Sequence, residues 1–430
     1  MTGHTITRLG HHGDGIADGP IFAPRTLPGE VVTGTPDGQT LRDIRIVDPS
    51  PDRVAPPCRH FRSCGGCQLQ HASDAYVARW KTEVTRTALA AHDIPARIAA
   101  VHTSPARARR RATLAARRTK AGAMAGFHAR GSDTITEIPD CHLLHPDLMA
   151  GLPLARDLAR VGTSRKAPLA VTLTRSRGGL DVAVTGGKPA DGPLRAALAD
   201  LARTHDAARL AWEGEVIVTR HAPEQVFGPA RVVPPPGAFL QATEQGEAAL
   251  LDAAGTILAD ARRIVDLFAG CGTFTLPLAR HAHLHAVEGD AAMLGALDHG
   301  WRHAEGLKPV TTEARDLYRR PLLADELARH DSALLDPPRA GAEAQIAELA
   351  AARLPRIAYI SCNPVTFARD ARHLIAHGYE MGAVQVVDQF RWSAHIELVA
   401  GFTLKPAGNP RDRRKKPLPP GQDSGVRSPQ

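Results

Sequence analysis

The sequence predicts an α/β protein in which a small N-terminal β-barrel and an inserted α+β domain precede a doubly wound, mostly parallel sheet. Short strand-like runs and glycine-rich turns fill residues 1–55, and a cysteine- and arginine-rich stretch follows them. From residue 264 onward, short β-rich runs alternate with helical segments. At 430 residues the chain can bury more than one hydrophobic core.

The N-terminal segment, residues 1–55, predicts a five-stranded barrel. Extended runs at residues 6–9, 16–17, 20–23 and 30–33 are separated by glycine-rich turns. Barrels of this kind often carry oligonucleotides on an open face, and the alternative is a structural β-module without a ligand.

Residues 56–235 form the expected central domain. Helical periodicity covers residues 74–97 through Tyr76, Trp80 and Val84. Beyond it, seven Arg or Lys residues within the fourteen positions 107–120 predict a strand with a cationic face. Such density favours contact with phosphate, whereas an ordinary solvated face is the alternative.

Residues 236–405 form the expected α/β domain. Its predicted strands lie at residues 264–268, 285–288, 332–336 and 357–361. The first strand runs into a Gly-x-Gly turn within residues 265–274 (VDLFAGCGTF), which lets a ligand approach the backbone and a helix N-terminus.

The turn favours a nucleoside cofactor without a pyrophosphate, such as S-adenosylmethionine. Phe274 and Thr275 stand where a dinucleotide site would need a third glycine. Glu288 ends the next strand about 20 residues after Asp266, where a carboxylate can accept both ribose hydroxyls. A turn that needs glycine only for packing is the alternative.

Two later strand ends carry reactive side chains, in residues 336–339 (DPPR) and 361–364 (SCNP). A Cys362 thiolate beside a methyl donor suggests methylation of a pyrimidine carbon, because a thiol added at C6 of uracil makes C5 nucleophilic. The intermediate must then lose its C5 proton, for which Glu397 is the candidate base. An inert cysteine and a solvent-facing edge-strand glutamate are the alternatives. Cytosine-C5 methylation and a non-catalytic iron-sulfur RNA-binding module are the competing functions.

Composition points to a cytoplasmic protein with a polyanionic partner. The formal net charge is +8 and the pI is about 9.4. Six cysteines are too few for a disulfide scaffold, the first thirty residues lack an apolar signal segment, and no apolar run is long enough to span a membrane. Residues 406–430 are predicted to be a disordered basic tail.

The chain resembles the RNA uracil-C5 methyltransferases over nearly its whole length, to about residue 405. The resemblance rests on GDGIA and LPGE in the barrel, the DLFAGCGTF turn, DPPR, SCNP and the late Glu397. It implies a class I S-adenosylmethionine-dependent methyltransferase (Rossmann-like) domain with a TRAM/OB-like N-terminal barrel and an inserted RNA-binding domain. It also implies Cys362 as the nucleophile, Glu397 as the base and 5-methyluridine as the product. The implied cofactor contacts are Gln241, Phe268, Thr273, Glu288, Asp316 and Asp336. Thr273 departs from the asparagine common in the family, which puts its side-chain contact in doubt.

Four cysteines have a spacing suited to a metal or cluster: Cys58, Cys64, Cys67 and the distant Cys141. Four thiolates can hold either a [4Fe-4S] cluster or a tetrahedral zinc ion. The resemblance implies the iron-sulfur cluster, with a structural or RNA-orienting role. A barrel together with cluster cysteines favours 23S rRNA as the substrate, with tRNA possible. We expect a monomer that binds neither DNA nor membranes.

Overall fold

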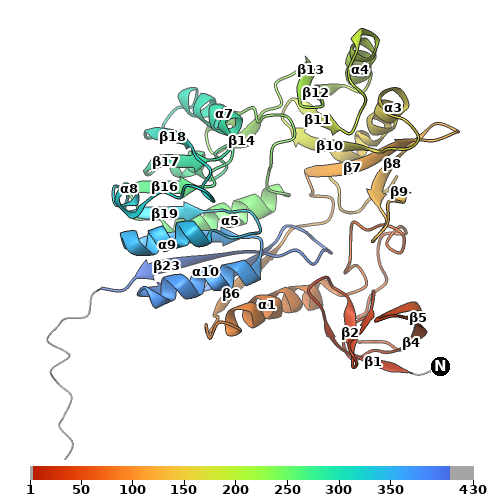
Figure 1. The fold of residues 1–430 in the computed structure, drawn as a ribbon, viewed down its shortest axis with the longest axis horizontal. Helices are drawn as coiled ribbons and strands as arrows, with labels where there is room; N and C mark the ends of the chain where they lie inside the picture. Colours follow the sequence, from red (N-terminus) through yellow and green to blue (C-terminus); the bar gives the residue numbers. More distant parts are fainter. Residues whose placement is uncertain (1–2, 407–430) are drawn as a thin grey trace, which may run out of the picture.

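The computed structural model describes residues 3–406 (Figure 1). The tail predicted at residues 406–430 lies outside the described residues from residue 407 onward. The described part contains a closed barrel, a seven-stranded sheet, a nine-stranded sheet and a two-stranded hairpin. No helix in this part of the chain is long and apolar enough to cross a membrane.

The predicted five-stranded barrel is confirmed, with strand order β1-β2-β3-β5-β4. Its strands are β1 (His4–Leu9), β2 (Gly15–Ala17), β3 (Ile21–Ala23), β4 (Val31–Asp37) and β5 (Thr40–Asp48). Ile6, Val32 and Leu41 are among the buried side chains that fill it. Gly15 must be glycine, since a Cβ there would lie 2.0 Å from Thr26 Oγ1.

Helix α1 (Asp74–Ala90) joins the barrel to the nine-stranded sheet (Figure 1). Ser73 caps it by accepting a hydrogen bond from the backbone N-H of Tyr76. The predicted extension of this helix to residue 97 is wrong: the chain turns at Asp93, which has a left-handed φ of 57°. Strand β6 (Ile98–Thr103) then enters the nine-stranded sheet beside β22.

A buried ion pair anchors α1 to this sheet. Lys81 Nζ donates to Asp388 Oδ1 at 2.6 Å and to the backbone oxygen of His395 at 2.7 Å. The two charged side chains are 0% and 1% exposed. Removal of either partner would leave an uncompensated buried charge, so the pair specifies how α1 docks.

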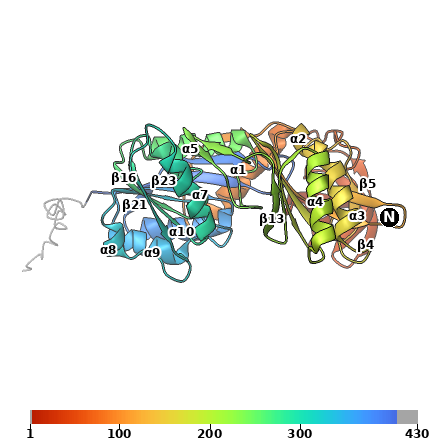
Figure 2. The same ribbon diagram turned by 90° about the horizontal axis from the view of Figure 1, so that it is seen from above.

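The central α+β region has a sheet of order β13-β12-β11-β10-β7-β8-β9. Its strands are β7 (Arg111–Arg118), β8 (Ala123–His128), β9 (Ile135–Glu137), β10 (Leu169–Ser176), β11 (Gly179–Thr185), β12 (Ala207–Trp212) and β13 (Glu215–Thr219). Helices α3 (Leu152–Gly162) and α4 (Gly192–Thr204) pack side by side against it, after the short α2 (Pro146–Ala150) (Figure 2). The hairpin of β14 (Gln225–Phe227) and β15 (Ala230–Val232) leads to the nine-stranded sheet.

The expectation of a cationic face over residues 107–120 is wrong for Arg110 and Arg111. Arg110 is 5% exposed, donates to the Gln241 carbonyl at 3.0 Å and pairs with Glu247. Arg111 donates to the Gly237 carbonyl at 2.9 Å, and burial lowers its pKa. Arg110 and Arg111 therefore tie β7 to the α/β half of the chain. In the stretch, the exposed basic residues are Arg107, Arg118 and Lys120.

The nine-stranded sheet has the order β18-β17-β16-β19-β20-β23-β22-β6, and β21 pairs with β23. Strands β16 (Arg263–Leu267), β17 (His283–Glu288), β18 (Val310–Ala314), β19 (Ser332–Leu335) and β20 (Arg356–Ser361) are parallel. Strands β21 (Tyr379–Met381), β22 (Val384–Asp388) and β23 (Glu397–Leu404) complete it, with β23 antiparallel to β20. The predicted doubly wound α/β fold is confirmed.

Helices cover both faces of this sheet. Side chains of α5 (Glu244–Ile257), α6 (Thr275–Leu278) and α7 (Ala291–Arg302) share one hydrophobic cluster. Side chains of α8 (Ala324–Leu327), α9 (Glu343–Ala352) and α10 (Pro364–Ala376) share the other, which Leu89 of α1 joins. The carboxyl ends of the parallel strands are thus left as the place for a ligand.

Candidate active site

The turn after β16 combines backbone that a ligand can approach with tight packing. Phe268, Gly270 and Gly272 all have positive φ, at 64°, 56° and 87°. A Cβ at Gly272 would lie 2.7 Å from Leu297 Cγ, so this glycine packs the turn against α7. A Cβ at Gly270 would meet nothing within 4 Å, so this part of the turn faces open space. The turn serves both purposes that its glycines suggested.

Glu288, at the end of β17, holds this turn in place. Its carboxylate accepts hydrogen bonds from the backbone N-H groups of Gly270 and Asp290, each at 3.0 Å. Asp316 is exposed and accepts from the backbone N-H of Tyr318 at 3.0 Å. The Tyr318 ring lies 5.5 Å from that of Phe268. Two predicted cofactor contacts, Phe268 and Asp316, are thereby linked through Tyr318, which the sequence did not single out.

Two carboxyl groups at neighbouring strand ends have raised pKa values. Asp266 is 1% exposed and accepts from Thr275 Oγ1 at 2.5 Å, and its Oδ1 has no partner among residues 3–406. Burial raises the pKa of Asp266 to about 7. Asp336 follows β19 and accepts from Gln241 Nε2 at 3.0 Å, and burial raises its pKa to about 7 as well. Thr273 lies half-buried in the same turn region.

The candidate nucleophile and base are neighbours across two antiparallel strands. Ser361 of β20 pairs with Leu398 of β23, so the next residues outward, Cys362 and Glu397, face each other. Glu397 is 5% exposed, and burial, reinforced by Asp336, raises its pKa to about 8. Burial and the Glu397 carboxylate raise the pKa of Cys362 to about 12, whereas Arg339 lowers it. The ends of β20 and β23 therefore bring together two residues that are 35 positions apart in the sequence.

Gln389, which the sequence analysis missed, connects the base to the predicted cofactor contacts. Its Nε2 donates to Gln241 Oε1 at 2.6 Å, and its side chain lowers the pKa of Glu397 against the larger effects of burial and Asp336. Its Oε1 accepts from the backbone N-H of Ala242 at 2.8 Å. A hydrogen-bonded chain therefore runs from Asp336 through Gln241 to Gln389, whose side chain favours the ionised form of Glu397. In the sequence, the only feature that could have pointed to Gln389 was its position directly after β22.

A Gln389→Leu substitution tests whether this chain tunes the base. The hydrogen bond from Gln389 favours the ionised form of Glu397, so its loss should raise the Glu397 pKa by about one unit and lower kcat about tenfold at neutral pH. The measurement is the pH profile of kcat, whose acid limb should move to higher pH. Gln345→Leu is the matched control: Gln345 is equally buried but bonds only to Leu322. An unchanged acid limb in Gln389→Leu would contradict the tuning role.

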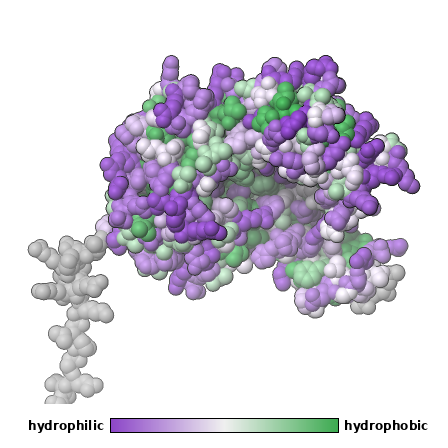
Figure 3. Space-filling view, turned by 45° about the horizontal axis from the view of Figure 1, so that its top comes forward, coloured by the Kyte–Doolittle hydropathy of each residue, from purple (hydrophilic) through white to green (hydrophobic). Residues whose placement is uncertain are grey.

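A cavity of about 550 Å³ surrounds Cys362. His11 and His12 of the barrel, Arg130 of the central region and His395 line it together with Cys362. The barrel is held there by Arg130, which donates twice to the Asp14 carboxylate, at 2.6 and 2.5 Å. The space-filling view shows the surface hollowed between the barrel and the rest of the molecule (Figure 3). All three sheets therefore contribute to the surroundings of the thiol.

The four cysteines predicted to bind a metal lie in one region of the structure, but their thiols are not arranged as a metal site. The thiols of Cys58 and Cys141 raise the pKa of both Cys64 and Cys67, to about 12 for Cys67, although burial contributes more. All four are free thiols. The backbone N-H of Gly66 donates to Cys64 Sγ and that of Leu143 to Cys141 Sγ, each at 3.4 Å. Within residues 3–406, however, no group of three or more His, Cys, Asp or Glu side chains is arranged to hold a metal ion.

The sheet order, the glycine turn after β16 and the carboxylate that ends β17 define the class of S-adenosylmethionine-dependent methyltransferases. Comparison with known proteins narrows this class. A family model described as tRNA (uracil-5-)-methyltransferase matches residues 303–405. A Brucella suis protein described as an uncharacterized RNA methyltransferase is 43% identical over 402 residues, which cover 93% of this chain and 97% of the relative.

Two further relatives carry more specific descriptions. The 23S rRNA (uracil(1939)-C(5))-methyltransferase RlmD of Halomonas elongata is 34% identical over 91% of this chain and 87% of its own length. The structure of Pyrococcus abyssi tRNA (uracil-54, C5)-methyltransferase with S-adenosyl-L-homocysteine matches with a TM-score of 0.72 at 20% identity, over 93% of this chain and 99% of that one. The chain belongs to the RNA uracil-C5 methyltransferase family, as its motifs indicated.

Proposed function

We propose that this enzyme transfers a methyl group from S-adenosylmethionine to C5 of a uridine in RNA through a covalent adduct between Cys362 and C6 of the base. The observation that carries the proposal is the pairing of Cys362 with the buried, weakly acidic Glu397 at the strand ends where this fold class binds its cofactor. A test is transfer of radiolabelled methyl groups by the purified protein to total RNA from a strain that lacks it, followed by nucleoside analysis. Formation of 5-methylcytidine instead of 5-methyluridine would contradict the choice of base.

The residues of the site support each step of this reaction. The Cys362 thiol first loses its proton to solvent in the open cavity, which burial opposes and the positive charge of Arg339 favours, and the thiolate sulfur then forms a bond to C6 while the C5=C6 electron pair moves into an enolate. The cofactor supplies the methyl group to C5 and leaves as S-adenosylhomocysteine. Glu397 then accepts the C5 proton, the C5=C6 double bond forms again, and the Cys362 thiolate leaves. With a pKa of about 8, Glu397 is a stronger base than an ordinary carboxylate.

For the substrate we propose 23S rRNA, with tRNA as the second candidate. The Halomonas relative named for 23S rRNA shares 34% identity over most of both chains, which is more than the 20% shared with the Pyrococcus structure named for tRNA. Mapping of 5-methyluridine in ribosomal and transfer RNA from a deletion strain would separate the two. Loss of the modified nucleoside from tRNA alone would overturn the ribosomal assignment.

We also propose that Cys58, Cys64, Cys67 and Cys141 hold a [4Fe-4S] cluster with a structural or RNA-orienting role. The donor set supports it: the four thiols are free, the other three all raise the pKa of Cys67, and two of the four accept hydrogen bonds from backbone N-H groups as cluster ligands do. Methyl transfer needs no electrons, so these residues would organise the loops on which they lie rather than take part in the chemistry.

Metal analysis of anaerobically purified protein tests this assignment. We expect iron and acid-labile sulfide in equal amounts, and loss of both in Cys67→Ser with a reduced thermal stability. Zinc without sulfide would show a tetrahedral zinc site instead, and the absence of both metals would contradict either ligand.

A further inference from the structure

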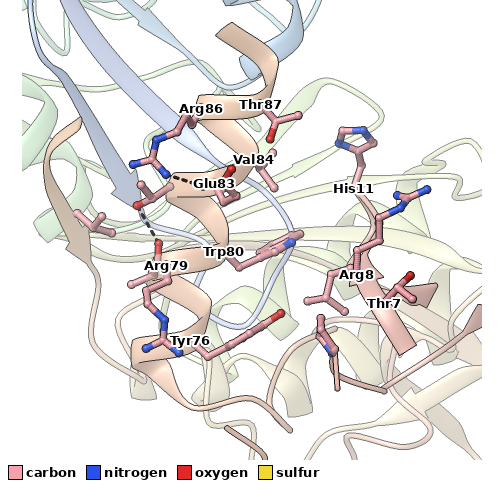
Figure 4. Close-up of a pocket in the computed structure, with 16 residues that line it drawn as sticks. Thr7, Arg8, His11, Tyr76, Arg79, Trp80, Glu83, Val84, Arg86 and Thr87 are labelled. Carbon is pink, nitrogen blue, oxygen red and sulfur yellow. Dashed lines mark hydrogen bonds and ion pairs between the residues drawn. The ribbon is translucent and has the colours of Figure 1, made fainter. Parts of the chain in front are cut away.

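A second cavity lies outside the catalytic site, between α1 and β1 (Figure 4). Its volume is about 780 Å³. Tyr76 and Trp80, four residues apart on one face of α1, point across it toward Arg8 and His11 on the barrel side (Figure 4). Trp80 is 8% exposed and packs with the Tyr76 side chain in the cluster between α1 and the barrel. The helix thus presents two aromatic side chains to the cavity, and the barrel presents the guanidinium of Arg8.

The charges of this barrel–helix cleft suit a polyanion. Arg79 and Arg86 also line the cleft, but each already has an acidic partner, Asp52 for Arg79 and Glu83 for Arg86. Arg8 is exposed and forms no ion pair with any of residues 3–406. An exposed, uncompensated guanidinium facing an aromatic ring is the combination that binds the phosphate and the base of an unpaired nucleotide.

The cleft adjoins the catalytic cavity. His11 and Val84 line both of them, and Cys362 lines the catalytic cavity. An RNA strand that places one nucleotide beside Cys362 can therefore place a nearby nucleotide in the cleft without leaving the protein surface.

We propose that the barrel–helix cleft binds an unpaired nucleotide near the target uridine, with its base stacked on Tyr76 and a phosphate on Arg8. The proposal rests on the RNA methylation proposed above and adds a second recognition site for the same strand. Recognition of an unstacked neighbour selects a loop or bulge over a regular helix, because a paired base cannot enter the cleft. The cleft would contribute to substrate choice while the chemistry proceeds elsewhere.

The test measures the affinity of the full-length protein for a short synthetic RNA centred on the uridine mapped in the deletion strain. Tyr76→Ala should weaken binding about tenfold, and Tyr76→Phe should restore it because the ring is kept. Arg8→Ala should weaken binding and reduce the slope of log affinity against log salt by about one. Arg280→Ala is the matched control, since Arg280 is also exposed and unpaired within residues 3–406 but precedes β17, which lies beside the edge strand β18 at the other end of the sheet from β6. In steady-state assays, KM for RNA should rise in Tyr76→Ala while kcat stays within about twofold.

A second measurement identifies the bound nucleotide. RNAs that lack a single base near the uridine are compared, and one abasic position should weaken binding to the wild type but not to Tyr76→Ala. If Tyr76→Ala and Arg8→Ala bind RNA as Arg280→Ala does, the proposal is overturned and the cleft has another occupant, such as a peptide. Because binding is measured without turnover, that result differs from a wild type that binds RNA but transfers no methyl group, which would overturn the proposed function alone.

Discussion

Replacement of Cys362 by alanine should abolish methyl transfer to RNA while leaving S-adenosylmethionine bound with nearly unchanged affinity. C5 of uracil is a poor nucleophile until a thiol adds at C6, and within residues 3–406 the other cysteine near the site, Cys271, is only 4% exposed and lies in the glycine turn, where no base can reach it. Loss of the nucleophile should cost at least about 10³-fold in kcat. The measurement is methyl transfer to RNA together with calorimetric titration of the cofactor.

Loss of activity in Cys362→Ala should not come from loss of folding, and a serine variant tests the same point. Cys362 is only partly buried, so the smaller alanine should leave the thermal midpoint close to that of the wild type. Cys362→Ser keeps the shape but offers a far weaker nucleophile, and it should be as inactive as the alanine variant. Full activity in either variant would rule out the covalent route.

Substitution of Glu397 by glutamine should trap the methylated adduct between Cys362 and RNA. Adduct formation and methyl transfer require the thiol, whereas release requires removal of the C5 proton by the base. The glutamine side chain cannot accept that proton, yet it preserves the shape of the buried site beside Gln389. We expect a protein–RNA complex that survives denaturing gels and turnover slowed by about 10²- to 10⁴-fold.

The double variant Cys362→Ala/Glu397→Gln is the control, since it should form no denaturation-resistant complex. Turnover of Glu397→Gln at the wild-type rate, without an accumulated adduct, would show that another group removes the proton. A slow rate without any adduct would instead place Glu397 before methyl transfer.

Glu397→Gln should also change how stability depends on pH. The folded-state pKa of Glu397, about 8, lies above its ordinary value of 4.5, so between these values the folded state binds the extra proton. The contribution of Glu397 to the free energy of unfolding is therefore present at low pH and is lost as pH rises toward 8. Denaturant unfolding from pH 5 to pH 8 should show a smaller loss of stability in Glu397→Gln than in the wild type.

The sequence predicted the features whose signals are local. Short runs between glycines gave the barrel, and apolar strands followed by helical segments gave the parallel sheet. Cys362 and Glu397 could be assigned to one site because both stand at strand ends, and the pairing of β20 with β23 places them together.

The features that the sequence did not predict depend on contacts between residues far apart in the chain. Arg110 stands in a basic run that suggests a solvated or RNA-facing surface, but Glu247, 137 residues further on, turns it into a buried ion pair. Gln389 has no local pattern, because its meaning comes from Gln241, 148 residues before it. The sequence likewise could not show that β6, which lies within residues 56–235, pairs with β22 in the nine-stranded sheet. The domain boundaries at residues 55 and 235 remain a proposal.

The pairing of β6 with β22 bears on how the enzyme is made. Strand β6 emerges from the ribosome long before its partner β22, and Asp388, which neutralises the buried Lys81, follows that lysine by 307 residues. Until then the edge of β6 and the apolar face of α1 have no sheet to bind. The sheet that carries Cys362 and Glu397 is therefore completed only after β22 has been made, so a chain that stops before β22 should be prone to aggregation rather than partly active.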